Sequence, residues 1–326
     1  MQSILAVTVP FFALVLCGYL ATRQRLLPEA AIPGLNAYVL FFALPCLLFK
    51  FGSSMPFSKL IDPTLMAIYA VCAMVMVFVT ISATLKSDDD RFGIDLKNSA
   101  FGALVAAFPN TGFMGVPLLV ALLGPKAAGP AIITILADLI IITSLCIALS
   151  RLDGADGHGA AKAARNALKG VAMNPMPWAI LAGALSSAVS LDLPKPVAQT
   201  LGMLADAASP VALFTIGAVL ARSQILTARG HAEPLVPGDY LLMALIKLLL
   251  HPVLVLVVGA LAISLGVPLS KFALTVMVLV AALPSASNVA MLAERYDADT
   301  ARVARIIMVT TAAAFLTFSG AVALLT

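Results

Sequence analysis

The stretch Leu104-Val105-Ala106-Ala107-Phe108-Pro109 decides the fold, because it returns nearly unchanged as Leu279-Val280-Ala281-Ala282-Leu283-Pro284. Each copy lies inside a long apolar run. A proline within a helix removes a backbone donor and clashes with the preceding turn. Hydrocarbon offers no hydrogen bonds to the freed backbone groups, so such a break is tolerated only where it lines a cavity. The sequence therefore predicts two membrane helices that are broken at equivalent positions.

Composition gives the class of protein around these breaks. Of the 326 residues, 61% are hydrophobic and 11% are charged, and the mean hydropathy of +1.05 excludes an ordinary soluble domain. The prediction is an all-α integral membrane protein with ten transmembrane helices. No basic residue precedes the first apolar run and no small-residue cleavage site follows it, which indicates a retained helix. The ten runs, each close to the roughly 20 residues of a spanning helix, are 3–21, 32–51, 64–85, 99–123, 128–149, 177–191, 201–221, 240–265, 272–293 and 302–325.

Basic residues are unequally distributed between the two sets of connections. Fourteen Lys and Arg residues lie in the connections after the odd-numbered runs, and five lie in the others. By the positive-inside rule the odd connections are cytoplasmic, so we expect a multi-pass protein of the inner (plasma) membrane with both termini outside the cytoplasm. The same bias explains the net charge of +4, which is therefore no evidence for nucleic acid binding.

The internal repeat extends beyond the hexapeptide. Residues of the first two runs recur at one offset of 165 residues in the sixth and seventh: Pro10, Gly18 and Leu20 as Pro175, Gly183 and Leu185, and Pro45, Leu48 and Phe49 as Pro210, Leu213 and Phe214. The hexapeptide has an offset of 175, and the connection at 222–239 can supply the extra residues. Chance similarity among helices rich in Ala, Leu and Val is the alternative. Each copy holds five helices, an odd number, so the second must enter the membrane from the opposite side.

The predicted domains follow from this repeat. They are a first five-helix repeat at 1–150, a basic cytoplasmic linker at 151–174, and a second, inverted five-helix repeat at 175–326. Within the linker, residues 160–168 are predicted to form a short helix with a basic face for the inner leaflet. A solvated linker is the alternative.

The breaks predict an anion site. After each break a half-helix begins, whose first N–H groups are unsatisfied and carry the positive end of the helix dipole. Two such ends near the midplane would bind an anion without a buried cation. The predicted substrate-binding residues are the prolines, which are favoured at a helix start, and the polar residues beyond them: Pro109, Asn110, Thr111, Pro284, Ser285, Ser287 and Asn288. The alternative for the polar side chains is that they satisfy the backbone freed by the kinks.

Four ionisable residues fall within the apolar runs: Asp138, Asp206, Lys247 and His251. An intramembrane charge is a functional hypothesis by default, so all four are candidates for coupling transport to an ion. The open alternatives are a structural ion pair between Asp138 and Lys247, a neutral His251 bonded near Pro252, and a helix-interface role for Asp206. The four cysteines have no paired spacing and are interpreted as core residues. No cofactor or metal site is predicted.

Four of the runs resemble the auxin efflux carrier family, which includes plant auxin exporters and bacterial carriers for malonate, malate and similar acids. The resemblance covers nearly the whole chain, and the motifs are Asn36-x-x-Val39-x-Phe41-Phe42-Ala43-x-Pro45, Pro109-Asn110-Thr111-x-x-Met114-Gly115-x-Pro117, Ala207-x-x-Pro210-x-Ala212-Leu213-Phe214-x-x-Gly217 and Ala281-Ala282-x-Pro284 with Ala293-Glu294-x-Tyr296. It implies that the fourth and ninth helices cross at their prolines and that Asn110 binds the substrate carboxylate. It also implies a scaffold of helices 1, 2, 6 and 7 and a moving domain of helices 3–5 and 8–10. If a homodimer forms, we expect it to form through the scaffold helices.

These observations predict a secondary transporter of a small organic anion, a mono- or dicarboxylate or an auxin-like acid, that works by alternating access in the lipid bilayer. An enzyme is not predicted, because the runs hold no paired carboxylates, no serine with a basic partner and no metal ligands at helical spacing. A passive anion channel and a ligand-binding membrane sensor are the alternatives. The coupling ion, a proton or sodium, stays open, because the third run lacks the acidic and basic pair of the plant carriers.

Overall fold

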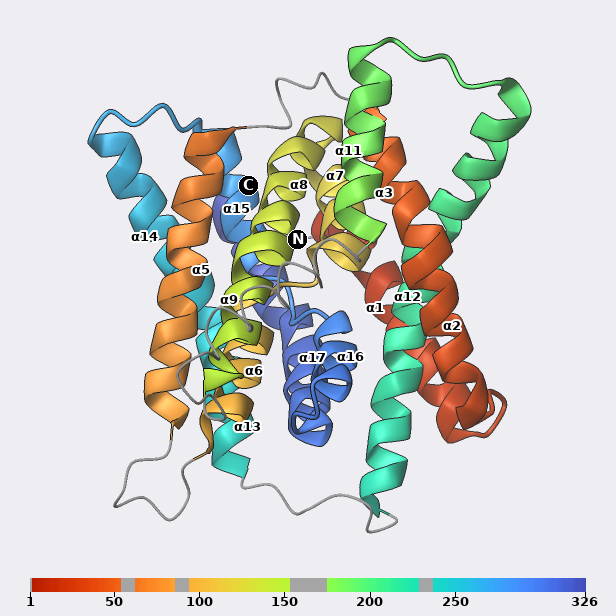
Figure 1. The fold of residues 1–326 in the computed structure, drawn as a ribbon, viewed down its shortest axis with the longest axis vertical. Helices are drawn as coiled ribbons and strands as arrows, with labels where there is room; N and C mark the ends of the chain where they lie inside the picture. The colour runs from red at the N-terminus through yellow and green to blue at the C-terminus, as the bar shows by residue number, and fades with distance from the viewer. Residues whose placement is uncertain (1, 54–61, 86–93, 153–174, 229–236) are drawn as a thin grey trace. The chain divides into compact units, whose positions relative to one another are not determined.

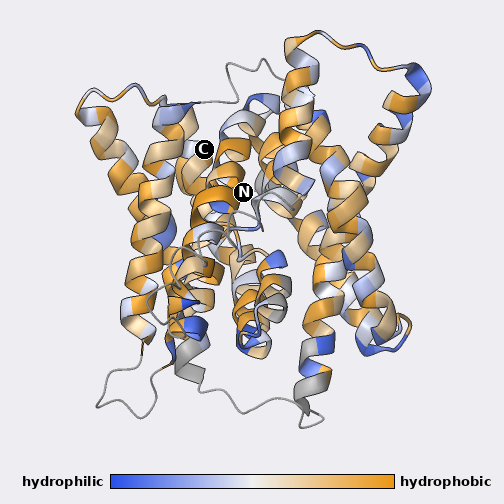
Figure 2. Cartoon of the chain, viewed as in Figure 1, coloured by the Kyte–Doolittle hydropathy of each residue, from blue (hydrophilic) through white to orange (hydrophobic). Residues whose placement is uncertain are grey.

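Helices make up the described part of the chain in the computed structural model, which describes residues 2–53, 62–85, 94–152, 175–228 and 237–326 (Figure 1). The only β pairing among these residues is two isolated bridges, Leu85 with Ile94 and Pro109 with Ser285. Hydrophobic residues cover most of the length of the helices (Figure 2). Within the described ranges, six helical stretches are long and apolar enough to span a membrane: Glu29–Ser53, Pro63–Thr84, Pro125–Leu149, Lys195–Arg222, Tyr240–Ser264 and Thr300–Leu325.

The predicted all-α, multi-pass class is therefore confirmed, whereas the count of ten spans stays a prediction. Two of the remaining four runs are divided by their breaks into half-helices that are each too short to span. These are α6 (Leu96–Ala107) with the segment Thr111–Leu123, and α15 (Lys271–Ala281) with α16 (Asn288–Arg295). The sixth run, α11 (Pro175–Ala188), has only 14 residues. The first run forms α1 (Gln2–Arg23), of which Val9–Arg23 is apolar.

The chain divides into two compact units, and each unit draws on both halves of the sequence. Unit 1 comprises the described residues of 1–62, 111–133 and 174–233, and unit 2 those of 63–110, 134–173 and 234–326. One boundary falls at the first break, between Asn110 and Thr111, and another falls within α8 (Ala128–Ala137). The predicted linker helix at 160–168 lies outside the described residues.

Unit 1 is built on two pairs of closely packed helices. Besides α1 and α11, it contains α2 (Ile32–Tyr38), α3 (Leu44–Ser53), α7 (Val116–Leu123) and α12 (Lys195–Ala228). Helix α1 packs along α12, and α3 packs along α11. Helix α12 continues as far as Ala228, so the predicted connection at 222–239 is helical in its first part.

Glycines set the close approach of α1 to α12. A Cβ atom on Gly18 of α1 would overlap the backbone carbonyl of Phe214 on α12, and a Cβ atom on Gly217 of α12 would overlap the carbonyl of Val15 on α1. Only glycine permits this backbone contact. Small residues at helix interfaces are the usual means of close packing between membrane helices.

The pair α3 and α11 repeats this contact residue for residue. A Cβ atom on Gly183 of α11 would meet the carbonyl of Phe49 on α3, and one on Gly52 of α3 would lie 2.7 Å from the carbonyl of Ile180 on α11. Each of these four residues lies 165 positions from its counterpart in the first pair, so the two sets of contacts interchange when the two halves of the sequence are exchanged.

Unit 2 contains the first break together with the whole of the second. Its helices are α5 (Pro63–Thr84), α6, α9 (Thr143–Leu149), α13 (Pro237–Leu245), α14 (His251–Ser264), α15, α16 and α17 (Thr300–Leu325). The half-helices α6 and α15 start in the same way: the Asp95 side chain caps the N–H of Asn98, and Ser270 caps the N–H of Ala273. These caps lie 175 residues apart, which is the offset of the hexapeptide.

In the part of the chain that the structure describes, turns of π-helix widen four helices, at Val39–Ala43, Thr111–Gly115, Asp138–Ile142 and Ile246–Leu250. Three of them end two residues before a proline, at Pro45, Pro117 and Pro252, so the wider turn accommodates a residue that lacks an N–H. The fourth is closed by the Thr143 hydroxyl, which donates to the Asp138 carbonyl at 2.8 Å. Such turns are frequent at functional sites, and two of them hold the ionisable residues Asp138 and Lys247.

Candidate functional site

The two breaks pair with each other inside unit 2. The backbone N–H of Asn110 donates to the carbonyl of Pro284 at 2.8 Å, and the N–H of Ala286 donates to the carbonyl of Phe108 at 2.9 Å. These two hydrogen bonds form an antiparallel bridge between Pro109 and Ser285. The crossing of the two breaks at their prolines, which the resemblance implies, is therefore a direct backbone contact.

This pairing satisfies much of the backbone that the prolines free. Ser285 adds to it, because its N–H donates to Oγ1 of Thr310 on α17 at 3.3 Å. Sequence reasoning did not identify Thr310, whose hydroxyl also donates to the Ile306 carbonyl of its own helix at 2.8 Å. Because the pairing is extended, neither proline lies in the first turn of the half-helix that follows it. The half-helix after Pro109 begins at Thr111, and the one after Pro284 begins at Asn288.

The polar side chains at the bridge are buried and are not used by the backbone. The side chain of Asn110 is 3% exposed and forms no hydrogen bond with another described residue. Ser285 is fully buried, and its Oγ has no hydrogen-bond partner among the described residues. A buried polar group without a partner is rare in proteins and calls for an explanation. A bound ligand would supply one.

The other predicted substrate-binding residues lie around this bridge in the sequence. Pro109 and Pro284 are buried in unit 2, and Ser287 and Asn288 are half-buried at the start of α16. Thr111 belongs to unit 1, where it is fully buried and its Oγ1 has no partner among the described residues.

A second cluster of polar side chains is fully buried in unit 2. The Tyr69 hydroxyl of α5 donates to Oδ2 of Asp138 at 3.1 Å, and the Lys247 Nζ lies 3.1 Å from Nδ1 of His251. The rings of Tyr69 and His251 lie 6.0 Å apart between centroids, which connects the two halves of the cluster. Tyr69 was missed from the sequence, where a single tyrosine in the uncharged third run gave no functional signal.

The direct ion pair between Asp138 and Lys247 is not formed, since their charged atoms do not approach within 4.0 Å. The Lys247 ammonium instead donates to the backbone carbonyl of Ala281 at 3.1 Å. Because lysine has donors only, Nδ1 of His251 is the acceptor, which corresponds to a neutral imidazole with its proton on Nε2. Neither this Nε2 nor Oδ1 of Asp138 has a hydrogen-bond partner among the described residues.

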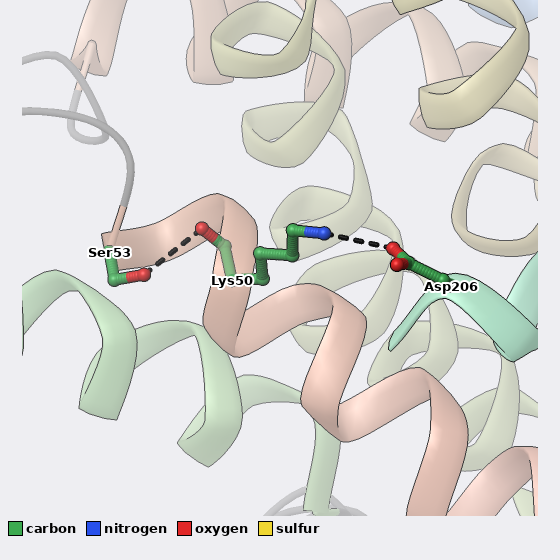
Figure 3. A network of polar contacts seen from close by, with 3 residues as sticks. All are labelled: Lys50, Ser53 and Asp206. Atoms are coloured by element: carbon green, nitrogen blue, oxygen red, sulfur yellow. Dashed lines mark hydrogen bonds and ion pairs between the residues drawn. The ribbon is translucent and has the colours of Figure 1, made fainter. Parts of the chain in front are cut away.

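The fourth predicted coupling residue, Asp206, lies in unit 1 and is not part of this cluster. It forms an ion pair of 2.8 Å with Lys50, which links α12 to α3 (Figure 3). The side chain of Asp206 is 72% exposed, and that of Lys50 is 52% exposed. This placement agrees with the helix-interface interpretation of Asp206.

A pocket of about 380 Å³ opens in unit 1 at the ends of α3 and α11, and none of the predicted substrate-binding residues lines it. Its lining is rich in hydroxyl groups, including those of Ser53, Ser186 and Ser190. Among the described residues, no group of three or more His, Cys, Asp or Glu side chains is placed to hold a metal ion. The predicted substrate site and this pocket are therefore separate features of the molecule.

Several apolar helices and two paired, proline-broken helices define a multi-pass membrane protein of the transporter class. The chain matches the family of membrane transport proteins over residues 3–322. It belongs to this family, which confirms the resemblance to the auxin efflux carriers.

Three relatives illustrate the match. The chain is 28% identical over 325 residues to a protein of Rhizobium meliloti (strain 1021) that is named "Putative malonate transporter", covering 98% of this chain and 95% of the relative. It is 28% identical over 312 residues to an "Uncharacterized transporter" of Methanothermobacter thermautotrophicus, covering 95% and 93%. It is 26% identical over 296 residues to the "Uncharacterized transporter YfdV" of Escherichia coli (strain K12), covering 89% and 88%. The family and these relatives are transporters rather than enzymes.

Proposed function

We propose that this protein is a secondary transporter of a small mono- or dicarboxylate, which it binds at the bridge between the two breaks. The observation that carries the proposal is the state of Asn110 and Ser285. Both side chains are buried beside the bridge, and neither is used by another described residue. An amide and a hydroxyl can donate to a carboxylate, and the backbone pairing leaves them available for this purpose.

The charge at the proposed site favours an anion. The half-helix that begins at Thr111 and the helix α16 that begins at Asn288 each start shortly after the bridge. Their first N–H groups lack partners within the helix and carry the positive end of the dipole. Malonate is the first ligand to test, since the name of the relative from Rhizobium meliloti includes it.

We further propose that the chain holds two inverted five-helix repeats. The interchangeable glycine contacts of unit 1 support this arrangement at the offset of 165, and the capped half-helices α6 and α15 of unit 2 support it at 175. An odd number of helices in each copy inverts the second copy in the membrane. The proposed topology places both termini outside the cytoplasm of the inner membrane.

Alternating access is the proposed mechanism, with unit 1 as the scaffold. Unit 1 holds the first, second, sixth and seventh apolar runs, which the resemblance assigns to the scaffold. It also holds residues 111–133, which the resemblance assigns to the moving domain. A homodimer through the helices of unit 1 stays a prediction.

A thermal-shift screen of the purified protein tests the binding proposal. A ligand that binds only the folded state raises the melting temperature. We expect stabilisation by carboxylates of two to six carbons, with malonate included, and a smaller shift in the Asn110→Ala variant. If no carboxylate of this series, nor indole-3-acetate, stabilises the parent protein, the proposed anion site is wrong.

A further inference from the structure

Lys247 has an unusual pair of hydrogen-bond partners. Its ammonium is fully buried, and it bonds Nδ1 of His251 on its own helix and the carbonyl of Ala281 on α15. Ala281 is the last residue of α15, three positions before Pro284. The side chain therefore joins the buried cluster to the end of the half-helix that leads into the second break.

The Ala281 carbonyl needs such a donor. The last carbonyls of a helix have no partner within it. Those of Val278 and Val280 accept from Ala282 and Leu283, but the N–H of Ser285, which would bond Ala281 in a continuous helix, goes to Thr310 instead. A cation at this end also interacts favourably with the negative pole of the helix dipole.

Among its described residues, the first repeat has no equivalent of this contact. At the offset of 175, Lys247 corresponds to Cys72 and Ala281 to Ala106, which are both buried and carry no charge in this arrangement. The half-helix α6 thus ends at its break without a lysine in the corresponding position. The first break is formed without such a cation. This indicates that Lys247 does more than stabilise the crossing of the two breaks.

We propose that Lys247 is a positioning residue that couples the charge state of the buried cluster to the second break of the substrate site. The inference rests on the proposed carboxylate site. With Asp138 ionised, the cluster of Asp138, Lys247 and a neutral His251 has no net charge. When Asp138 takes up a proton from solvent, the Lys247 charge is no longer balanced by its neighbour and favours an anion at Ser285. Proton binding and carboxylate binding then strengthen each other, as for a proton symporter.

Other titratable groups near the lysine do not change this balance. Those that face it are Asp138, His251 and, on the far side of Asp138, Tyr69, beside which lies the buried thiol of Cys72 on the same helix. Helices α17 and α6 also pack against the turn at Ile246–Leu250, and α15 holds the Ala281 carbonyl. The charged residues of these three helices all lie in the first two turns: Arg302 and Arg305 on α17, Lys97 on α6 and Lys271 on α15.

Calorimetric titration of the full-length protein with malonate, in two buffers of different ionisation enthalpy, measures the affinity and the protons exchanged together. The parent protein should take up protons on binding, and its affinity should rise as pH falls, by at most about tenfold per pH unit for one proton. Lys247→Met should bind more weakly and take up almost none. Lys271→Met removes an exposed lysine at the other end of α15 and should match the parent. Equal proton uptake in Lys247→Met and the parent would overturn the inference.

Hydrogen exchange gives a test that needs no ligand. Peptides that cover 279–290 should exchange faster in Lys247→Met than in the parent, while peptides that cover 96–107 of the other half-helix should not change. Unchanged exchange at 279–290 would contradict the role of the lysine even if the protein bound no carboxylate. Should Lys247→Met fail to fold, Asp138→Asn supplies the test: it keeps the lysine and imitates the protonated cluster, so its malonate affinity should lose its dependence on pH. A pH dependence equal to that of the parent would again overturn the inference.

Discussion

Asn110 and Pro284, which are 174 positions apart in the chain, are joined by a backbone hydrogen bond of 2.8 Å. Through this bond one broken helix supplies the partner that the other lacks. The main chain and the side chain of Asn110 therefore have different roles. The main chain forms the hydrogen bond at the crossing, and the buried side chain is available to another partner. The proposed substrate site follows from this division of roles.

Replacing Asn110 by Ala should therefore weaken carboxylate binding and leave the fold intact. The expected loss is about 1 to 3 kcal/mol, the range for removing one partner of a buried hydrogen bond. Titration of the purified variant with malonate, together with its melting temperature, measures both effects.

Asn98→Ala is the matched control, because it makes the same change in α6 where the side chain has a structural role. The Asn98 Oδ1 accepts the N–H of Asp299 at 2.7 Å, so this variant should melt at a lower temperature and keep its affinity. If Asn110→Ala kept the parent affinity and only lost stability, Asn110 would be a structural residue as well.

Pro109→Ala and Pro284→Ala should each reduce substrate binding by about tenfold or more, because a continuing helix removes a positive half-helix end from the site. Both variants should remain folded, with a melting temperature close to that of the parent, since the backbone hydrogen bonds of a continuous helix replace those that the bridge gives up. Normal binding in Pro284→Ala beside an inactive Pro109→Ala would mean that the second break is not half of the site.

The repeat predicts that Gly18→Ala and Gly183→Ala have similar effects on stability. The added Cβ atom meets a backbone carbonyl in each case, Phe214 or Phe49, and overpacking of this kind typically costs about 1 to 3 kcal/mol. Gly202→Ala on α12 is the control, because its Cβ atom meets nothing within 4 Å, and a gain of up to about 1 kcal/mol is expected there. Melting temperatures in detergent test the prediction, which fails if the effects at Gly18 and Gly183 differ in sign.

Cysteine labelling tests the topology that the basic residues predict. In a background whose four native cysteines are replaced by alanine, a cysteine at Lys126 should react with an impermeant maleimide on intact cells, and one at Ala160 should be protected. The reverse pattern would contradict the placement of both termini outside the cytoplasm.

The breaks could be read from the sequence because proline and a repeated hexapeptide are local signals. The same holds for the class of fold, since apolar runs report membrane helices directly. The contact between the breaks could not be derived, because a hydrogen bond between Asn110 and Pro284 depends on how two distant helices approach. The offset of 165 was readable, whereas the four glycine contacts that share it appear only when helices α1, α3, α11 and α12 are packed.

The buried cluster shows a different limit of sequence reasoning. Asp138, Lys247 and His251 were found because charges are rare in apolar runs. An ion pair was the simplest arrangement for two of them, but the structure gives each another partner, Tyr69 for Asp138 and Ala281 for Lys247. A tyrosine is common in membrane helices and a backbone carbonyl has no sequence signature, so neither partner could be identified beforehand.

Counterflow in proteoliposomes tests the central claim most directly. Vesicles that contain the purified protein are loaded with unlabelled malonate, and the entry of radiolabelled malonate is followed. A carrier with a single alternating site exchanges the two, so the label should accumulate transiently above its external concentration, and Asn110→Ala should lose this overshoot while Asn98→Ala retains it. Label that only equilibrates, or an overshoot that survives in Asn110→Ala, would contradict a carboxylate carrier whose site lies at the crossing of the two broken helices.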